Sequence, residues 1–202
     1  MFHNGFPFVN DVVVGRVIAT IPLENHGNCK GRVTDEEISY FWGQTRISFP
    51  YRIYALEVKD AVFSKMDYIE KMILHCIYTR SCDGYVRERH IKALLSGNYP
   101  EWAIPYIIKV CDEYVVELLQ IVYDSLRGKN TDEFIKFCAE NHAAFCKSYS
   151  RMISYWNAYY RKWDDYHKHE CYDFENYVGR KLFTECFGAE HKNLLRASGS
   201  SG

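Results

Sequence analysis

The chain has 202 residues, of which 48% are hydrophobic and 16% aromatic, a composition that excludes a disordered protein and suffices for one folded domain. Its 25 basic and 26 acidic residues give a formal net charge of −1, without the basic surplus that a sequence-independent nucleic-acid binder uses to neutralise phosphates. The first residues lack the basic stretch of a signal peptide, and no apolar run approaches the length of a membrane span. We therefore expect a cytoplasmic protein whose partners are neither nucleic acid nor membrane.

The chain contains eight cysteines but no Cys-x-x-Cys pair, so the usual zinc-ribbon and thioredoxin-like spacings are absent. Several of these cysteines fall on the apolar faces of expected helices, where a free cysteine behaves as a small hydrophobic residue. Without a secretory signal, reduced thiols are the expected state.

Residues 12–21 are rich in valine and isoleucine and are closed by Pro22, a pattern that predicts a β-strand. A lone strand cannot satisfy its own backbone N–H and C=O groups. It should therefore pair with residues 6–9, with the segment around Ile47, or with another chain. We expect the short N-terminal β element within residues 6–21.

Beyond this strand the signals are helical. Three pairs have the spacing of a capping box, in which each side chain reaches the backbone N–H of the other residue: Thr34 with Glu37, Asp67 with Glu70, and Asn130 with Glu133. Pro50 is placed for the first turn of a helix, and apolar residues repeat at helical spacing over residues 51–62. Gly97 and Gly128 are placed to end helices.

The most apolar predicted helix runs from Pro105 to Leu126. Its polar side chains form one narrow stripe, which comprises Lys109, Glu113, Glu117, Gln120 and Asp124. A helix that is apolar over most of its circumference is typical of the middle of a bundle. Glu113 and Glu117 could be paired carboxylates for a metal or a proton relay, but their place on the polar stripe favours a solvent-facing or salt-bridged role.

From Thr131 no glycine or proline occurs until Gly179, so this stretch either bends near residues 147–150 or projects as an extended helix. The small residues of 197–202 indicate a flexible tail, which we expect over residues 191–202. These patterns predict a mainly α fold. We expect a single helical-bundle-like domain over residues 1–190, with about six or seven helices and the short N-terminal β element.

Aromatic residues crowd the segment from Tyr149 to Phe183. A set at alternating spacings of three and four is predicted to share one helical stripe: Tyr149, Met152, Trp156, Tyr159, Trp163 and Tyr166. Tyr155 and Tyr160 lie off this stripe, so one buried seam cannot cover every ring. Partly exposed aromatic side chains dominate recognition surfaces, and Tyr149, Trp156, Tyr159, Trp163 and Tyr166 are therefore the candidate binding surface.

The function that best fits this pattern is non-catalytic recognition of another protein, as in a small immunity, antitoxin or adaptor protein. One alternative is a structural homodimer joined through the aromatic stripe. No P-loop, GxGxxG or GxSxG motif occurs, so nucleotide binding and the common serine hydrolase site have no support in the sequence.

Two sets of potential metal ligands have helical spacing. Cys138, His142 and Cys146 are four residues apart, and His167 and Cys171 repeat the same spacing. A zinc site formed by Cys138, His142, His167 and Cys171 would need the two segments side by side. If the chain reverses near Tyr149, however, the two pairs are out of register by about two helical turns. We therefore expect core packing with neither a bound metal nor a cofactor.

Arg161 and His167 place a histidine a short distance after an arginine, which resembles the ribonuclease motif of HEPN domains, a family of small helical bundles. The resemblance covers these two residues, and Lys162 departs from the smaller polar residue that the family prefers. It implies that Arg161 would stabilise charge on a phosphate and that His167 would transfer a proton. A HEPN-like ribonuclease is the catalytic alternative to protein recognition.

Overall fold

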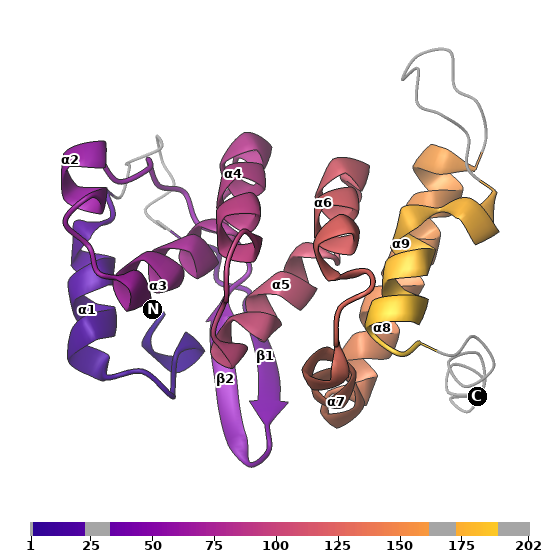
Figure 1. The fold of residues 1–202 in the computed structure, drawn as a ribbon, viewed down its shortest axis with the longest axis horizontal. Helices are drawn as coiled ribbons and strands as arrows, with labels where there is room; N and C mark the ends of the chain where they lie inside the picture. Colours follow the sequence, from indigo (N-terminus) through magenta and orange to yellow (C-terminus); the bar gives the residue numbers. More distant parts are fainter. Residues whose placement is uncertain (1, 23–32, 162–172, 190–202) are drawn as a thin grey trace. The chain divides into compact units, whose positions relative to one another are not determined.

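The computed structural model describes residues 2–22, 33–161 and 173–189 (Figure 1). Within these ranges the chain forms nine α-helices and a two-stranded antiparallel sheet, so the predicted mainly α class with a short β element is confirmed. The tertiary contacts divide the chain into two compact units, Met1–Ile107 and Ile108–Gly202, where the sequence indicated one domain over residues 1–190. Each unit is described by itself.

Unit 1 combines a β-hairpin with four helices. Its elements are α1 (Asp11–Thr20), β1 (Glu37–Trp42), β2 (Thr45–Pro50), α2 (Asp60–Phe63), α3 (Tyr68–Tyr78) and α4 (Gly84–Leu95). The boundary between the units falls within α5 (Ile104–Val110).

The predicted strand at residues 12–21 is wrong, because this segment is helix α1. The Asn10 side chain caps the helix by accepting a hydrogen bond from the Val12 N–H at 2.9 Å. Val14 and Val17, one turn apart, are buried, whereas Val12 is 73% exposed. The buried valines thus repeat with the period of a helix. Their β-propensity suggested a strand, but packing of one helical face against the core overrides that propensity.

The β element lies instead at β1 and β2, so the helix predicted after Thr34 is wrong. The strands pair antiparallel from Glu37 opposite Pro50 to Trp42 opposite Thr45, and Gly43 supplies a φ of +57° in the connecting turn. The helix predicted over residues 51–62 is also wrong. Residues 51–59 continue as extended chain, and α2 begins only at Asp60.

Three stacked rings form part of the core of unit 1. The Tyr106 ring lies 5.1 Å from that of Phe6 and 4.2 Å from that of Phe49, measured between centroids. Gly5 allows this packing, because a Cβ atom there would lie 2.1 Å from the Tyr106 hydroxyl oxygen.

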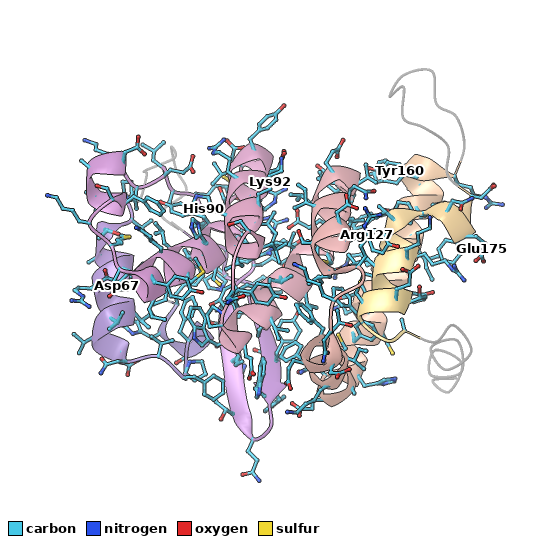
Figure 2. All side chains as sticks on the ribbon, viewed as in Figure 1. Asp67, His90, Lys92, Arg127, Tyr160 and Glu175 are labelled. Atoms are coloured by element: carbon cyan, nitrogen blue, oxygen red, sulfur yellow. The ribbon has the colours of Figure 1, made fainter. Side chains whose placement is uncertain are left out.

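The capping box at the start of α3 is confirmed. The Asp67 carboxylate accepts from the Glu70 N–H at 2.9 Å, and the Glu70 carboxylate accepts from the Asp67 N–H at 3.0 Å. Asp67 stands at the exposed end of α3 (Figure 2). This helix then buries seven consecutive residues from Met72 to Tyr78.

Unit 2 is built from short helices and irregular turns. Its elements are α6 (Val116–Leu126), α7 (Asp132–Glu140), α8 (His142–Tyr155), a π-turn (Trp156–Tyr160), a 3₁₀-turn (Phe174–Asn176), α9 (Val178–Lys181) and a second π-turn (Leu182–Cys186). Rings of α8 and the second π-turn pack in its core, with Phe145 stacked on Phe183 at 5.4 Å.

Two predicted helices are interrupted in the structure, which raises the helix number above the expected six or seven. The helix expected from Pro105 to Leu126 ends at Val110 and restarts at Val116. The stretch after Thr131 breaks at Asn141, whose side-chain amide donates to the Phe137 carbonyl at 2.9 Å. A local side-chain hydrogen bond of this kind competes with helix continuation.

Candidate functional site

The extended segment after β2 is fixed against the helices of unit 1 by buried side chains. The fully buried Arg80 donates to the Tyr51 carbonyl from Nε at 3.2 Å and from Nη2 at 3.0 Å. The Tyr78 hydroxyl donates to the Leu56 carbonyl at 2.6 Å. These bonds fix the backbone at Tyr51 and at Leu56. The next residue, Glu57, can therefore reach side chains of α4.

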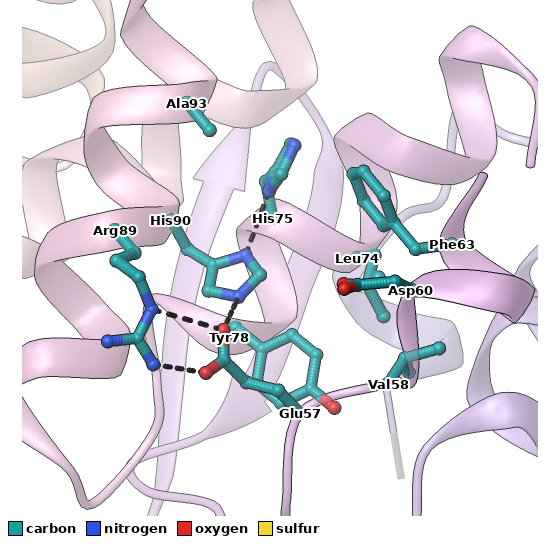
Figure 3. Close-up of a pocket in the computed structure, with 10 residues that line it drawn as sticks. All are labelled: Glu57, Val58, Asp60, Phe63, Leu74, His75, Tyr78, Arg89, His90 and Ala93. Atoms are coloured by element: carbon teal, nitrogen blue, oxygen red, sulfur yellow. Dashed lines mark hydrogen bonds and ion pairs between the residues drawn. The ribbon is translucent and has the colours of Figure 1, made fainter.

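Glu57, His90 and His75 form a hydrogen-bonded chain, which we call the histidine relay (Figure 3). Oε1 of Glu57 lies 2.9 Å from Nε2 of His90, and Nδ1 of His90 lies 2.8 Å from Nδ1 of His75. Arg89 pairs with the other oxygen of the Glu57 carboxylate. Both histidines are 8% exposed, so the relay is mostly removed from water.

Burial and neighbouring groups determine the charge of each residue of the histidine relay. Partial burial alone would raise the pKa of Glu57, but hydrogen bonds from Arg89 and His90 outweigh it, so this pKa is lowered. Burial lowers the pKa of His90, against the opposing hydrogen bond to Glu57. Burial, followed by the charges of His90 and Lys71, lowers the pKa of His75 to about 4. The relay at neutral pH is therefore a carboxylate followed by two neutral imidazoles.

These charges assign the tautomers. The Glu57 carboxylate only accepts, so Nε2 of His90 carries a proton and donates to it. Nδ1 of the neutral His90 is then a bare acceptor, and Nδ1 of His75 donates to it. Nε2 of His75 is consequently left with a free lone pair. Figure 3 shows this nitrogen at the end of the ring that points away from His90.

A pocket of about 300 Å³ opens beside the relay. Its lining comes from the extended segment, α2, α3 and α4, and comprises Glu57, Val58, Asp60, Phe63, Leu74, His75, Tyr78, Arg89, His90 and Ala93. Figure 3 shows Asp60 and Phe63 of α2 across the pocket from Arg89. The pocket thus joins an apolar wall to a polar end.

A second candidate surface lies in unit 2, where three tyrosine rings contact one another. We call Tyr114, Tyr155 and Tyr159 the tyrosine cluster. The Tyr114 ring centroid lies 5.9 Å from that of Tyr155 and 5.6 Å from that of Tyr159, and the latter two lie 6.3 Å apart. Tyr114 is 53% exposed and Tyr159 45% exposed, which leaves much of their ring surface in water.

A buried tyrosine, Tyr160, is hydrogen-bonded to the backbone of the tyrosine cluster. The hydroxyl of Tyr160, which is 4% exposed, donates to the Tyr114 carbonyl at 2.7 Å. The Tyr160 ring stacks on that of Tyr177 at 5.5 Å. The turn that carries Tyr114 is therefore tied to the π-turn that carries Tyr159, which limits the motion of the exposed rings.

The tyrosine cluster differs from the aromatic stripe expected from the sequence. Tyr149 is 2% exposed and lies in the core, so it does not reach the surface. Trp156 is half-buried and packs on Phe174 at 4.8 Å, and Tyr159 is exposed as expected. Tyr149 is buried because its ring packs on that of Phe183 in the core of unit 2, at 5.6 Å between centroids. The π-turn at Trp156–Tyr160 then departs from the 3.6-residue period on which the stripe was predicted. Trp163 and Tyr166 lie outside the described residues.

The residues of the alternative zinc site are distributed differently from the expected helical face. Cys138 is buried on α7, whereas His142 is exposed and begins α8, with the break at Asn141 between them. Nε2 of His142 lies 3.5 Å from Sγ of Cys146. No group of three or more metal-ligating side chains gathers within the part of the chain that the structure describes. His167 and Cys171 lie outside it.

Arg161, the arginine of the HEPN-like motif, is exposed at the end of the π-turn. Its Nη1 donates to the Asn157 side chain at 2.9 Å, and its guanidinium lies 5.8 Å from the Trp156 ring centroid. His167, the proposed proton-transfer residue, falls outside the described residues. The catalytic alternative therefore stays a prediction.

The polar residues expected as one stripe on the central helix are divided between buried and exposed positions, and the helix itself is interrupted after Val110. Lys109 and Glu113 are each 4% exposed, whereas Glu117 is exposed on α6. Oδ2 of Asp112 lies 2.5 Å from Nζ of Lys109 and 2.5 Å from Nη1 of Arg151. We call Lys109, Asp112 and Arg151 the ion cluster. In it, the cations of Lys109 on α5 and Arg151 on α8 compensate the buried carboxylate of Asp112, which lies in the turn between α5 and α6.

Sequence reasoning did not find the histidine relay. A histidine within the otherwise apolar run of α3 was the available signal, since a buried imidazole needs a hydrogen-bond partner. Its partners could not be read from the sequence, because Glu57 lies 33 residues before His90. Tyr114 was missed for the same reason, because its ring partners are about forty residues away in the chain.

Comparison of the chain with protein-family models, with curated proteins and with solved structures finds no match. In residues 2–22, 33–161 and 173–189, none of the helices combines the length and the apolar character that crossing a membrane requires.

Proposed function

We propose that the chain is a protein-recognition module and that the tyrosine cluster of unit 2 is its contact surface. The observation that carries the proposal is the mutual contact of Tyr114, Tyr155 and Tyr159 while two of the rings remain about half exposed. Tyrosine brings a large rigid contact area and a polar hydroxyl to an interface, and it is enriched among residues that carry binding energy.

Preorganisation supports this role. Because Tyr160 anchors the Tyr114 carbonyl and stacks on Tyr177, the exposed rings lose little conformational freedom when a partner docks. Trp156, which packs on Phe174 beside the cluster, would contribute the rim of the same surface. The partner is another protein, and the role is that of an immunity, antitoxin or adaptor protein.

We propose that this recognition takes place in the cytoplasm. Six cysteines in the described residues are free thiols, namely Cys76, Cys82, Cys111, Cys138, Cys146 and Cys186. Reduced cysteines on this scale are typical of a reducing compartment. Alkylation of the protein in freshly lysed source cells tests this, since oxidised cysteines would escape labelling and contradict the proposal.

The test of recognition is capture of a partner from the source organism with three forms of the chain. Wild type and Tyr85→Ala should retain the same partner, because Tyr85 is 76% exposed but belongs to α4 of unit 1 and is not a member of the tyrosine cluster. Tyr114→Ala combined with Tyr159→Ala should lose it, with a loss of roughly 2 kcal/mol or more in binding. Equal capture by all three forms would contradict the proposal.

The same proteins separate the alternatives. If wild type is a dimer by light scattering and the double tyrosine variant is a monomer, the tyrosine cluster joins two copies of the chain. If the protein cleaves RNA and Arg161→Ala abolishes cleavage, the HEPN-like ribonuclease is the correct reading. Unchanged thermal unfolding of each variant is the control for folding.

A further inference from the structure

The pocket of unit 1 has a polar end made of two hydrogen-bond acceptors. Nε2 of His75 has no hydrogen-bond partner in the described part of the chain, and it is not among the polar atoms sealed from solvent. Asp60, the first residue of α2, lines the same pocket, and within the described residues its carboxylate makes no hydrogen bond or ion pair. A ligand that enters this pocket therefore meets two oxygen or nitrogen acceptors.

The donors close to His75 and Asp60 are already engaged, and the donor left in the lining, Nη1 of Arg89, belongs to a residue across the pocket from Asp60 (Figure 3). The Tyr78 hydroxyl donates to the Leu56 carbonyl, and Nε of Arg89 faces Oε1 of Glu57 at 3.5 Å while its Nη2 pairs with Oε2. The Nδ1–H of His75 is used within the histidine relay. The polar end of the pocket thus suits a ligand that donates hydrogen bonds.

The charges around the pocket indicate whether the hydrogen-bond donor of the ligand is cationic or neutral. Among the lining residues, Glu57 and Arg89 neutralise each other, which leaves the carboxylate of Asp60 as the remaining charge. The ammonium of Lys71, which lies outside the lining, is placed over the Phe63 ring, 5.4 Å from its centroid. The carboxylate of Asp60 favours a cation over a neutral donor at its own end of the pocket, whereas the charge of Lys71, which also lowers the pKa of His75, opposes a cation.

We propose that this pocket binds a small organic molecule that carries a primary ammonium group on a short apolar body. The ammonium has three N–H donors and would bond Nε2 of His75 and the carboxylate of Asp60. The body would pack against Phe63, Leu74 and Ala93, which line the apolar wall. This binding function is independent of the tyrosine cluster in unit 2.

The proposal is tested by NMR titration of the full chain at pH 7 with three probes of one shape: benzylammonium, benzyl alcohol and benzoate. Benzylammonium should shift the backbone resonances of Leu74 and Ala93 in a saturable way, and benzoate should not. Benzyl alcohol should bind at least about tenfold more weakly than benzylammonium. Equal binding of the alcohol, or tighter binding of benzoate, would overturn the proposal.

Two variants locate the site. Asp60→Asn should weaken benzylammonium binding at least about tenfold, whereas Asp11→Asn should leave it unchanged. Asp11 is the matched control, since it is also the first residue of a helix but lies on α1, outside the pocket lining. His75→Asn can keep an N–H donor toward His90 and removes the Nε2 acceptor together with the rest of the ring, so it should also weaken binding. Unchanged affinity in both pocket variants would contradict the proposal.

A direct readout of the acceptor does not depend on any variant folding. Long-range ¹H–¹⁵N spectra distinguish the two neutral tautomers of histidine. We expect the Nδ1–H tautomer for His75 and the Nε2–H tautomer for His90 at pH 7. The opposite assignment would place a proton on Nε2 of His75, remove the acceptor, and overturn the proposal.

Discussion

The two units bury polar side chains in different ways. In unit 2, the ion cluster places two cations, Lys109 and Arg151, on one oxygen of Asp112, so charge is compensated by charge. In unit 1, the histidine relay passes hydrogen bonds from the Glu57 carboxylate through two neutral rings to an end that accepts nothing from the described residues. Both arrangements leave one acceptor over: Oδ1 of Asp112 is sealed from solvent, whereas Nε2 of His75 is not sealed and lines the pocket.

The largest effect should come from breaking the ion cluster. Asp112→Ala removes the carboxylate that holds Lys109, which is 4% exposed, and it should lower the free energy of unfolding by about 3–5 kcal/mol. Chemical denaturation followed by circular dichroism measures this loss.

The matched control is Asp124→Ala, which removes an exposed aspartate that pairs with Arg127 at 3.3 Å. Exposed pairs contribute at most about 1 kcal/mol, so this variant should remain close to wild type. If Asp112→Ala is as stable as the control, the ion cluster is not a structural element of unit 2.

The histidine relay should make the free energy of unfolding depend on pH in the acid range. The pKa of His75 is lowered from 6.5 to about 4 on folding, so the unfolded chain binds a proton there first. Its contribution to stability is complete above pH 6.5 and is lost as the pH falls toward about 4, a loss of roughly 3 kcal/mol. Denaturation midpoints between pH 7 and pH 4 record it.

His75→Asn is the control for this titration, because asparagine does not ionise. The variant should lose less stability than wild type over the same pH range. A remaining slope is expected from His90, whose pKa is also lowered on folding, and from Glu57 at the acid end. Parallel curves for the two proteins would show that His75 is not held neutral by the fold.

Replacing the arginine of each site should change stability by different, smaller amounts. Arg151, with a side chain 28% exposed, bonds the buried Asp112, and Arg151→Ala should cost about 2 kcal/mol. Arg89, with a side chain 57% exposed, bonds Glu57 at the surface, and Arg89→Ala should cost less than about 1 kcal/mol. Equal losses in thermal unfolding would contradict the distinction between a closed and an open polar site.

A small loss of stability should come from removing a hydrogen bond that is local to one helix end. Asp67→Ala removes the capping box of α3, and it should cost about 1 kcal/mol because one N–H at the helix start loses its partner. The ionisation of His75 and the ion cluster should be unaffected, as NMR titration of the histidine resonances would show. A change in the His75 pKa would mean that the start of α3 and the relay are coupled.

Some features that act over a few residues could be predicted from the amino-acid sequence. The capping box of Asp67 and Glu70 spans three residues, so its hydrogen bonds depend on α3 alone and were predicted correctly. The mainly α class follows in the same way from helical apolar spacing in α3, α4 and α6. The exposure of Tyr159 was also anticipated, from the excess of rings over what one buried seam can cover.

Tertiary packing selects which face of a segment is buried and which distant residues meet. Residues 11–20 became helix because Val14 and Val17 found partners on one side, although their β-branched side chains also suit a strand. The histidine relay joins Glu57 to His90 across 33 residues, and the tyrosine cluster joins Tyr114 to the π-turn that begins at Trp156. Such contacts depend on how the elements pack, and local spacing carries no information about partners that the chain brings together only after folding.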